Sequence, residues 1–121
     1  MNVADRASSG AEAKVELDIF SGRPNPAWTL SASQRDELLR LLRIERPKVA
    51  GPALPGLGYR GLTVRVQQGR KTDVFHVSDG AIEIDRGHRA DTGNAIERFL
   101  LKTMPAELKT QFSTIIPALP D

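Results

Sequence analysis

The chain contains no cysteine, which excludes disulfides, thiolate metal sites and thiol nucleophiles. No apolar run approaches the length that crosses a membrane. Residues 1–13 also lack the apolar segment of a secretory signal, and their Ala, Ser and Gly content predicts a disordered tail. These absences lead us to expect a soluble, cytoplasmic protein that does not associate with membranes.

Charge of one sign is also lacking, because 17 Lys and Arg face 15 Asp and Glu, for a net charge of +2. A balance of this kind argues against a dedicated nucleic-acid surface. The basic residues are nonetheless dominated by arginine, with 12 Arg and 5 Lys, and arginine suits bidentate contacts with carboxylates and phosphates. A length of 121 residues supports one core, so we expect residues 14–121 to form a single domain.

The clearest structural pattern covers residues 62–84, which we predict to form a three-stranded antiparallel meander. Asp79-Gly80 is typical of a two-residue type I′ turn, and Gly69-Arg70 fits a type II′ turn. Both turns, taken with the apolar alternation, place the same side chains on one face of the sheet. These are Leu62, Val64, Phe75, Val77, Ile82 and Ile84.

A fourth strand is predicted over residues 14–20, where Val15, Leu17 and Ile19 alternate with acidic residues. If the helix that follows is a right-handed crossover, this strand lies parallel to the strand at 61–68. We therefore expect a two-layer α+β fold with the order β-α-β-β-β-α-α. Its sheet would be mixed and four-stranded, with the helices on one face.

Three helices are expected from capping and periodicity. Ser31 and Gln34 form a capping-box pattern ahead of an apolar stripe that ends before Pro47. Asp91 is the expected cap of a second helix, and Pro105 is expected in the first turn of a short third one. The inward residues of these helices are Leu38, Leu41, Leu42, Ile96, Phe99, Leu100, Leu108 and Phe112.

The most informative segment for function is the connection from Phe20 to Trp28, which contains two X-Pro pairs. Proline fixes φ and extends the residue before it, so Arg23 and Asn25 sit on a stiff backbone. A stiff segment presenting Arg, Asn and the only Trp loses little entropy on binding. The alternative is that Trp28 fills the core edge and the loop only reverses the chain.

The parallel crossover would bring this loop to the same end as the 69–71 turn and the 85–91 connection. Basic side chains would then gather beside Trp28 and the start of the second helix, which suits an anion or an acidic partner. The residues predicted to bind are Arg23, Asn25, Trp28, Arg70, His88 and Arg89, with Lys71 and Arg86 nearby.

Other sequence patterns give less information about function. Residues 56–61 match G-x-G-x-x-G, but they precede a strand instead of opening a helix, so they do not predict a dinucleotide site. His76 falls between Thr63 and Glu83 on the outer sheet face, as a surface pair or a general base with its orienting carboxylate. Two histidines without a repeated carboxylate spacing predict no metal site, and no catalytic residue or cofactor is indicated.

The connector from Lys48 to Arg60 is long for a compact domain. Connectors of this length are often functional or mobile. The alternative is that Leu54, Leu57 and Tyr59 cover one edge of the core.

These features favour a non-catalytic binding or interaction module that uses the 21–28 loop against an anionic small molecule or an acidic protein partner. The first alternative is a small enzyme, or an accessory subunit, that acts on an anionic substrate at a basic site. The second is RNA binding, which arginine favours but for which the outer sheet face lacks base-stacking aromatic residues. The sequence leaves the ligand and the oligomeric state open.

Overall fold

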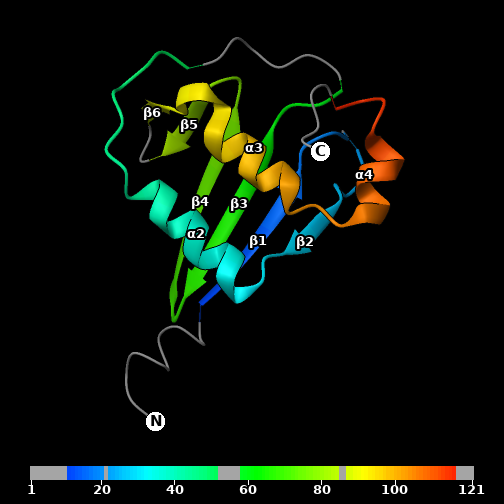
Figure 1. The fold of residues 1–121 in the computed structure, drawn as a ribbon, viewed down its shortest axis with the longest axis horizontal. Helices are drawn as coiled ribbons and strands as arrows, with labels where there is room; N and C mark the ends of the chain where they lie inside the picture. The colour runs from blue at the N-terminus through cyan, green and yellow to red at the C-terminus, as the bar shows by residue number, and fades with distance from the viewer. Residues whose placement is uncertain (1–10, 21, 52–57, 85–86, 117–121) are drawn as a thin grey trace.

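The computed structural model describes residues 11–20, 22–51, 58–84 and 87–116. It has an α+β fold in which α2 and α3 cross one face of a six-stranded sheet (Figure 1). The strands are β1 (Ala11–Leu17), β2 (Ala27–Thr29), β3 (Leu62–Gln68), β4 (Lys71–Ser78), β5 (Ala81–Ile84) and β6 (Gly87–Ala90). The helical elements are α2 (Ala32–Leu42), the 3-10 turn η1 (Thr92–Asn94), α3 (Ala95–Lys102) and α4 (Ala106–Phe112).

The sheet has the order β2-β1-β3-β4-β5-β6, and every neighbouring pair is antiparallel. The expected mixed, four-stranded sheet is therefore wrong in strand number and in the direction of β1. Leu17 lies opposite Leu62, and Ala11 lies opposite Gln68. The crossover rule holds only when a connection joins parallel strands. Here β2 reverses the chain after β1, and the connector after α2 returns it to the end of β1.

Two short strands, β2 and β6, escaped prediction. β2 has three residues and follows two prolines, whereas β6 has the sequence Gly-His-Arg-Ala, without a β-branched residue. The residues of β6 are not types enriched in strands, and β2 is too short to show an alternating pattern, so both depend on a neighbouring strand that supplies hydrogen bonds. β6 also pairs on its outer side with the connector, where Val49 N–H donates to the His88 carbonyl at 3.1 Å.

The predicted meander is confirmed. Val64 pairs with Phe75, and Val77 pairs with Ile82. Asp79 and Gly80 have φ of 50° and 79°, as a type I′ turn requires, and the φ of 62° at Gly69 fits the first position of a type II′ turn. Turn chemistry and apolar alternation thus fixed the same register.

The first strand starts at Ala11, three residues before the expected domain boundary at residue 14. Ala11 and Ala13 are buried, so the apolar alternation of β1 extends toward the N-terminus through small residues. Residues 1–10 of the expected tail lie outside the described residues.

The caps of the helices behave largely as expected. Gln34 N–H donates to Ser31 Oγ at 3.2 Å, and Ser31 N–H donates to Gln34 Oε1 at 2.9 Å, which completes the capping box. The Asp91 carboxylate accepts from the amides of Ile96 and Glu97 at the start of α3. Each acceptor satisfies an amide that has no partner within its helix.

Arg35 of α2 has a buried side chain, although arginine is mostly exposed in proteins. It donates to the carbonyl of Ala11 at 2.9 Å, which ties α2 to the first residue of β1. A buried guanidinium needs such partners to offset its loss of water.

The core lies between the sheet and the helices and draws on nearly every element. The largest fully buried apolar side chains are Val15, Leu17, Leu38, Leu62, Val64, Val77, Ile82, Ile96 and Leu100. Tyr59 of the connector packs against this cluster, as expected if the connector covers one edge of the core. Leu54 and Leu57 lie outside the described residues.

Val64 and Arg65 provide a test of the sheet register. Val64 is 1% exposed, so Val64→Asp should lower the free energy of unfolding by several kcal/mol through burial of an unpaired charge. Arg65 lies on the other face, opposite Lys14, so Arg65→Asp replaces a like-charge pair with an opposite-charge pair and should be neutral or slightly stabilising. Urea denaturation measures both variants, and equal losses would contradict the register.

Candidate functional site

Asn25 stabilises the loop between β1 and β2 from within. Its Oδ1 accepts hydrogen bonds from the amides of Ile19 and Phe20, at 3.0 and 2.7 Å, and its Nδ2 donates to Asp18 Oδ1 at 3.4 Å. The side chain thus bonds to the chain that enters the loop, while Pro24 and Pro26 restrict the backbone on either side. These hydrogen bonds and prolines restrict the described residues of the loop without the help of a ligand.

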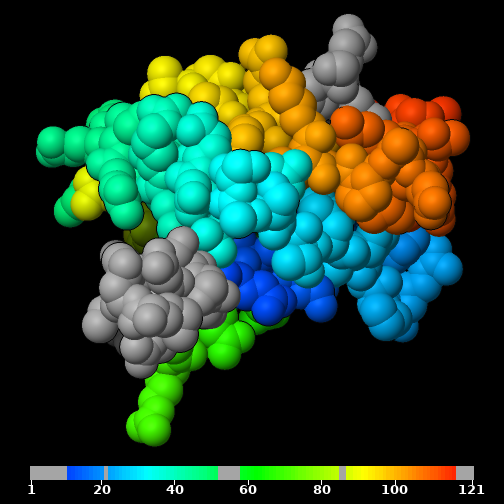
Figure 2. Space-filling model, turned by 60° about the horizontal axis from the view of Figure 1, so that its bottom comes forward, coloured from blue at the N-terminus to red at the C-terminus, as the bar shows by residue number. Residues whose placement is uncertain are grey.

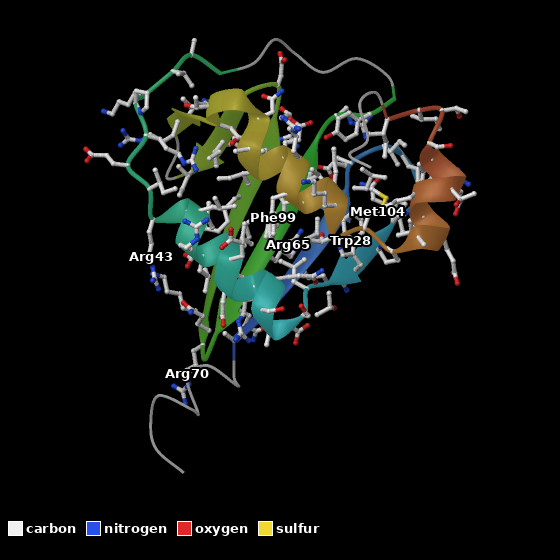
Figure 3. All side chains as sticks on the ribbon, viewed as in Figure 1. Trp28, Arg43, Arg65, Arg70, Phe99 and Met104 are labelled. Atoms are coloured by element: carbon white, nitrogen blue, oxygen red, sulfur yellow. The ribbon has the colours of Figure 1, made fainter. Side chains whose placement is uncertain are left out.

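Trp28 belongs to the core and not to the loop surface. It is 7% exposed, and its Nε1 donates to Thr103 Oγ1 at 2.9 Å, at the end of α3 (Figure 3). Side chains alternate along a strand, so Trp28 faces the helices while its neighbours in β2 face away. The structure therefore agrees better with the interpretation in which Trp28 fills the edge of the core than with the one in which it contacts a ligand.

Arg23 is exposed and held by an aromatic ring. Its guanidinium carbon lies 3.7 Å from the centroid of the Phe20 ring, which gives a cation–π contact. Phe20 is fixed in turn by an edge-on contact with Phe112 of α4, with the ring centroids 5.9 Å apart. In Figure 2 the lighter blue surface that follows β1 lies beside the orange surface of α4.

A second arginine, Arg60, also contacts Phe20. Arg60 donates from Nη2 to the carbonyl of Phe20 at 2.6 Å, and its own amide donates to the carbonyl of Asp18 at 2.8 Å. Within the described part of the chain, neither Arg23 nor Arg60 forms an ion pair with a carboxylate. We call Arg23, Arg60 and Phe20 the arginine site.

Asp18 organises the polar groups next to the arginine site. Its Oδ2 accepts from Thr63 Oγ1 at 2.6 Å and from His76 Nε2 at 3.0 Å. The hydrogen bond to Asp18 raises the pKa of His76, against the opposing effect of burial. We call Asp18, Asn25, Thr63 and His76 the Asp18 cluster.

A glycine permits the close approach of strands beside this cluster. Gly61 has a φ of 95°, and a Cβ there would lie 2.3 Å from the carbonyl oxygen of Val77. Only glycine fits both the conformation and the space. The G-x-G-x-x-G residues that the structure describes thus lead into β3, as expected, and their last glycine serves strand packing.

His76 has a different main partner from the one expected. The register places it opposite Thr63 and Glu83, as predicted, but its hydrogen bond goes to Asp18. Asp18 is one of the acidic residues that alternate with Val15, Leu17 and Ile19 in the sequence. No feature of the sequence indicated that this residue would lie beside His76 of β4. The Thr63 hydroxyl donates to Asp18 and not to the His76 imidazole.

The other predicted site residues lie elsewhere. Arg70 is in the β3–β4 turn, at the far end of the sheet from the loop (Figure 3). His88 and Arg89 are on β6, at the sheet edge opposite to β2. His88 Nε2 lies 3.6 Å from Glu83 Oε2, and Arg89 donates to the carbonyl of Arg46 at 3.3 Å. The expected grouping of six residues does not form because β1 is antiparallel to β3.

A buried polar cluster near the start of α3 carries two perturbed groups. The hydroxyl of Tyr59 donates to Glu97 Oε2, and Arg46 Nη1 lies 3.8 Å from Asp91 Oδ1. Burial is the largest cause that raises the pKa of Glu97, and the neighbouring Asp91 charge adds to it. Burial and the bond to Glu97 likewise raise the pKa of Tyr59.

Comparison with known proteins adds no family: no family model, curated protein or solved structure matches the chain. In the described ranges no three or more Asp, Glu or His side chains are grouped so that they could hold a metal ion. No helix in those ranges has the length and apolar character needed to cross a membrane.

The roles of Trp28 and Asn25 can be separated from that of Arg23 by stability. Trp28→Ala should lose roughly 3–5 kcal/mol because it empties a core position. Asn25→Ala should lose about 1–3 kcal/mol because the amides of Ile19 and Phe20 lose their acceptor. Arg23→Ala should leave the melting temperature within a few degrees. Calorimetric melting of the three variants checks the order, and a strongly destabilised Arg23→Ala would contradict it.

Glu97 should make stability fall as pH rises. Its folded pKa is raised, so the folded state retains a proton that the unfolded chain releases above about pH 4.3. The stabilisation is complete below that pH and is lost as pH passes the folded pKa. Glu97→Gln keeps an acceptor for Tyr59 and should remove this component. Urea unfolding from pH 4 to 8 compares the two proteins, and parallel curves would refute the assignment.

Proposed function

We propose that this protein is a non-catalytic binding module that holds an anionic small molecule, or an acidic group of a protein partner, at the arginine site. The observation that carries the proposal is the stacked guanidinium of Arg23, 3.7 Å from the centroid of Phe20 and without a carboxylate partner in the described residues. Of the residues predicted from the sequence, the proposal retains Arg23 as the contact and Asn25 as the residue that positions its loop.

The Arg23 guanidinium is held in position before an anion binds, which favours binding. A guanidinium stacked on a ring keeps its in-plane N–H groups available for a bidentate contact with a carboxylate or phosphate. Arg23 loses little side-chain entropy on binding, because its guanidinium already lies over Phe20, whose amide is held by Asn25. Arg60 adds a second positive charge beside the carbonyl of Phe20.

A small enzyme, or an accessory subunit of one, that acts on an anionic substrate is the second candidate, and the hydrogen-bonded Asp18–His76 pair next to the arginine site favours it. The pair resembles a base with its orienting carboxylate. Against catalysis, Nε2 of His76 is already bonded to Asp18, and the ring donates a further hydrogen bond to the Arg60 backbone. A substrate would have to displace one of them.

RNA binding has less support. The helix-free face of the sheet presents mostly charged and polar side chains, with Ala27 and Val74 as apolar exceptions, and its described strand residues include no Phe, Tyr or Trp. These residues are Glu12, Lys14, Glu16, Ala27, Thr29, Thr63, Arg65, Gln67, Thr72, Val74, His76, Glu83 and His88. Single-stranded RNA is bound largely by stacking its bases on aromatic rings, so a face without Phe, Tyr or Trp offers a poor stacking surface.

Titration calorimetry and thermal shift with inorganic phosphate, citrate and a glutamate-rich peptide test the proposal. At least one of these anions should bind the wild type and raise its melting temperature. Arg23→Ala should weaken that binding about ten-fold or more, whereas Arg70→Ala, at the other end of the sheet, should leave it unchanged. Absence of binding to every anion, or equal weakening by both variants, would refute the arginine site.

A further inference from the structure

The Asp18 cluster joins three parts of the chain through polar side chains, in addition to their backbone pairing and apolar packing. Asp18 lies directly after β1, Thr63 lies on β3, and His76 lies on β4. Asn25 extends the network into the loop, where its Oδ1 accepts from the amides of Ile19 and Phe20. The side-chain connection from β4 to the loop therefore runs through His76, Asp18 and Asn25.

His76 is partly accessible, which lets it exchange protons with solvent. Its side chain is 33% exposed on the helix-free face of the sheet, while that of Asp18 is 15% exposed. The groups that face its ring are the Asp18 carboxylate, Glu83 on β5 and the backbone of Arg60 ahead of β3. Thr63 opposes it on β3, and Glu16 and His88 continue the same row on β1 and β6.

We propose that protonation of His76 latches residues 18–20 and 22–26 onto the sheet, so that the order of the loop that carries Arg23 depends on pH. The imidazolium donates a charge-assisted hydrogen bond to Asp18. Loss of the proton leaves a neutral hydrogen bond to a carboxylate that Thr63 and Asn25 still hold. The loop then opens more often, although it remains folded.

The chemistry gives the direction and size of the effect. All groups facing the His76 ring are acidic or neutral acceptors, so they stabilise the charged form over the neutral one. The latch is therefore complete at low pH and weakens as pH rises through the titration of His76. The difference between a charged and a neutral hydrogen bond corresponds to about three- to ten-fold in the loop-opening equilibrium.

The latch has a consequence for binding that rests on the proposed function. If Arg23 binds anions, its affinity should fall at high pH in step with loop opening, because an unlatched loop must be ordered again on binding. The latch itself needs no ligand, so it is tested separately.

Amide hydrogen exchange of Ile19 and Phe20 reads the latch directly. Their opening constants, corrected for intrinsic exchange, should rise about three- to ten-fold between pH 6 and pH 9 in the wild type. The midpoint should match the titration of the His76 ring followed by NMR, which is readily assigned because the chain has two histidines. An opening constant that does not change with pH would overturn the proposal.

His76→Gln and His88→Gln form the matched pair of variants. His88 also faces a carboxylate, Glu83, but is not connected to the loop, so His88→Gln should keep the pH dependence. His76→Gln should abolish it and leave the loop amides in the open-prone state at every pH. Loss of the dependence in His88→Gln would overturn the proposal. If no anion binds while the exchange follows His76, the proposed function fails and the latch stands.

Discussion

The antiparallel pairing of β1 with β3 is the constraint on which the rest of the structure depends. It places three completely buried residues of β1, Ala13, Val15 and Leu17, inside the sheet, where β1 lies between β2 and β3. It also fixes the end of the sheet at which the chain leaves β1, beside the start of β3. The loop that follows is thereby brought to Arg60 and separated from the β3–β4 turn.

The sequence predicted the turns and the meander correctly, but it did not predict how β1 pairs with β3. Asp79-Gly80 and Gly69-Arg70 determined the meander because a two-residue turn leaves one register for its strands. The direction of β1 relative to β3 depended on the connector between α2 and β3. No turn signal in the sequence predicts the path of that connector. β2 and β6 were missed because their residues become strands only through their neighbours.

The candidate site was predictable in the same partial way. The prolines and Asn25 indicated a stiff loop, and that loop presents Arg23 with its guanidinium stacked on Phe20. The contribution of Arg60 was hidden, since it lies far along the chain and reaches the loop only through the sheet pairing. The binding role of this arrangement remains our proposal, and it is supported by a guanidinium that is fixed in place and lacks a carboxylate partner in the described residues.

We propose that an anion binds this protein where β1 ends and β3 begins. The most direct measurement is an NMR titration with inorganic phosphate that follows the Nε–H signals of the arginine side chains. If the arginine site binds phosphate, the signals of Arg23 and Arg60 should shift saturably and that of Arg70 should stay unchanged. Shifts centred on Arg70, or uniform small shifts at all exposed arginines, would contradict it.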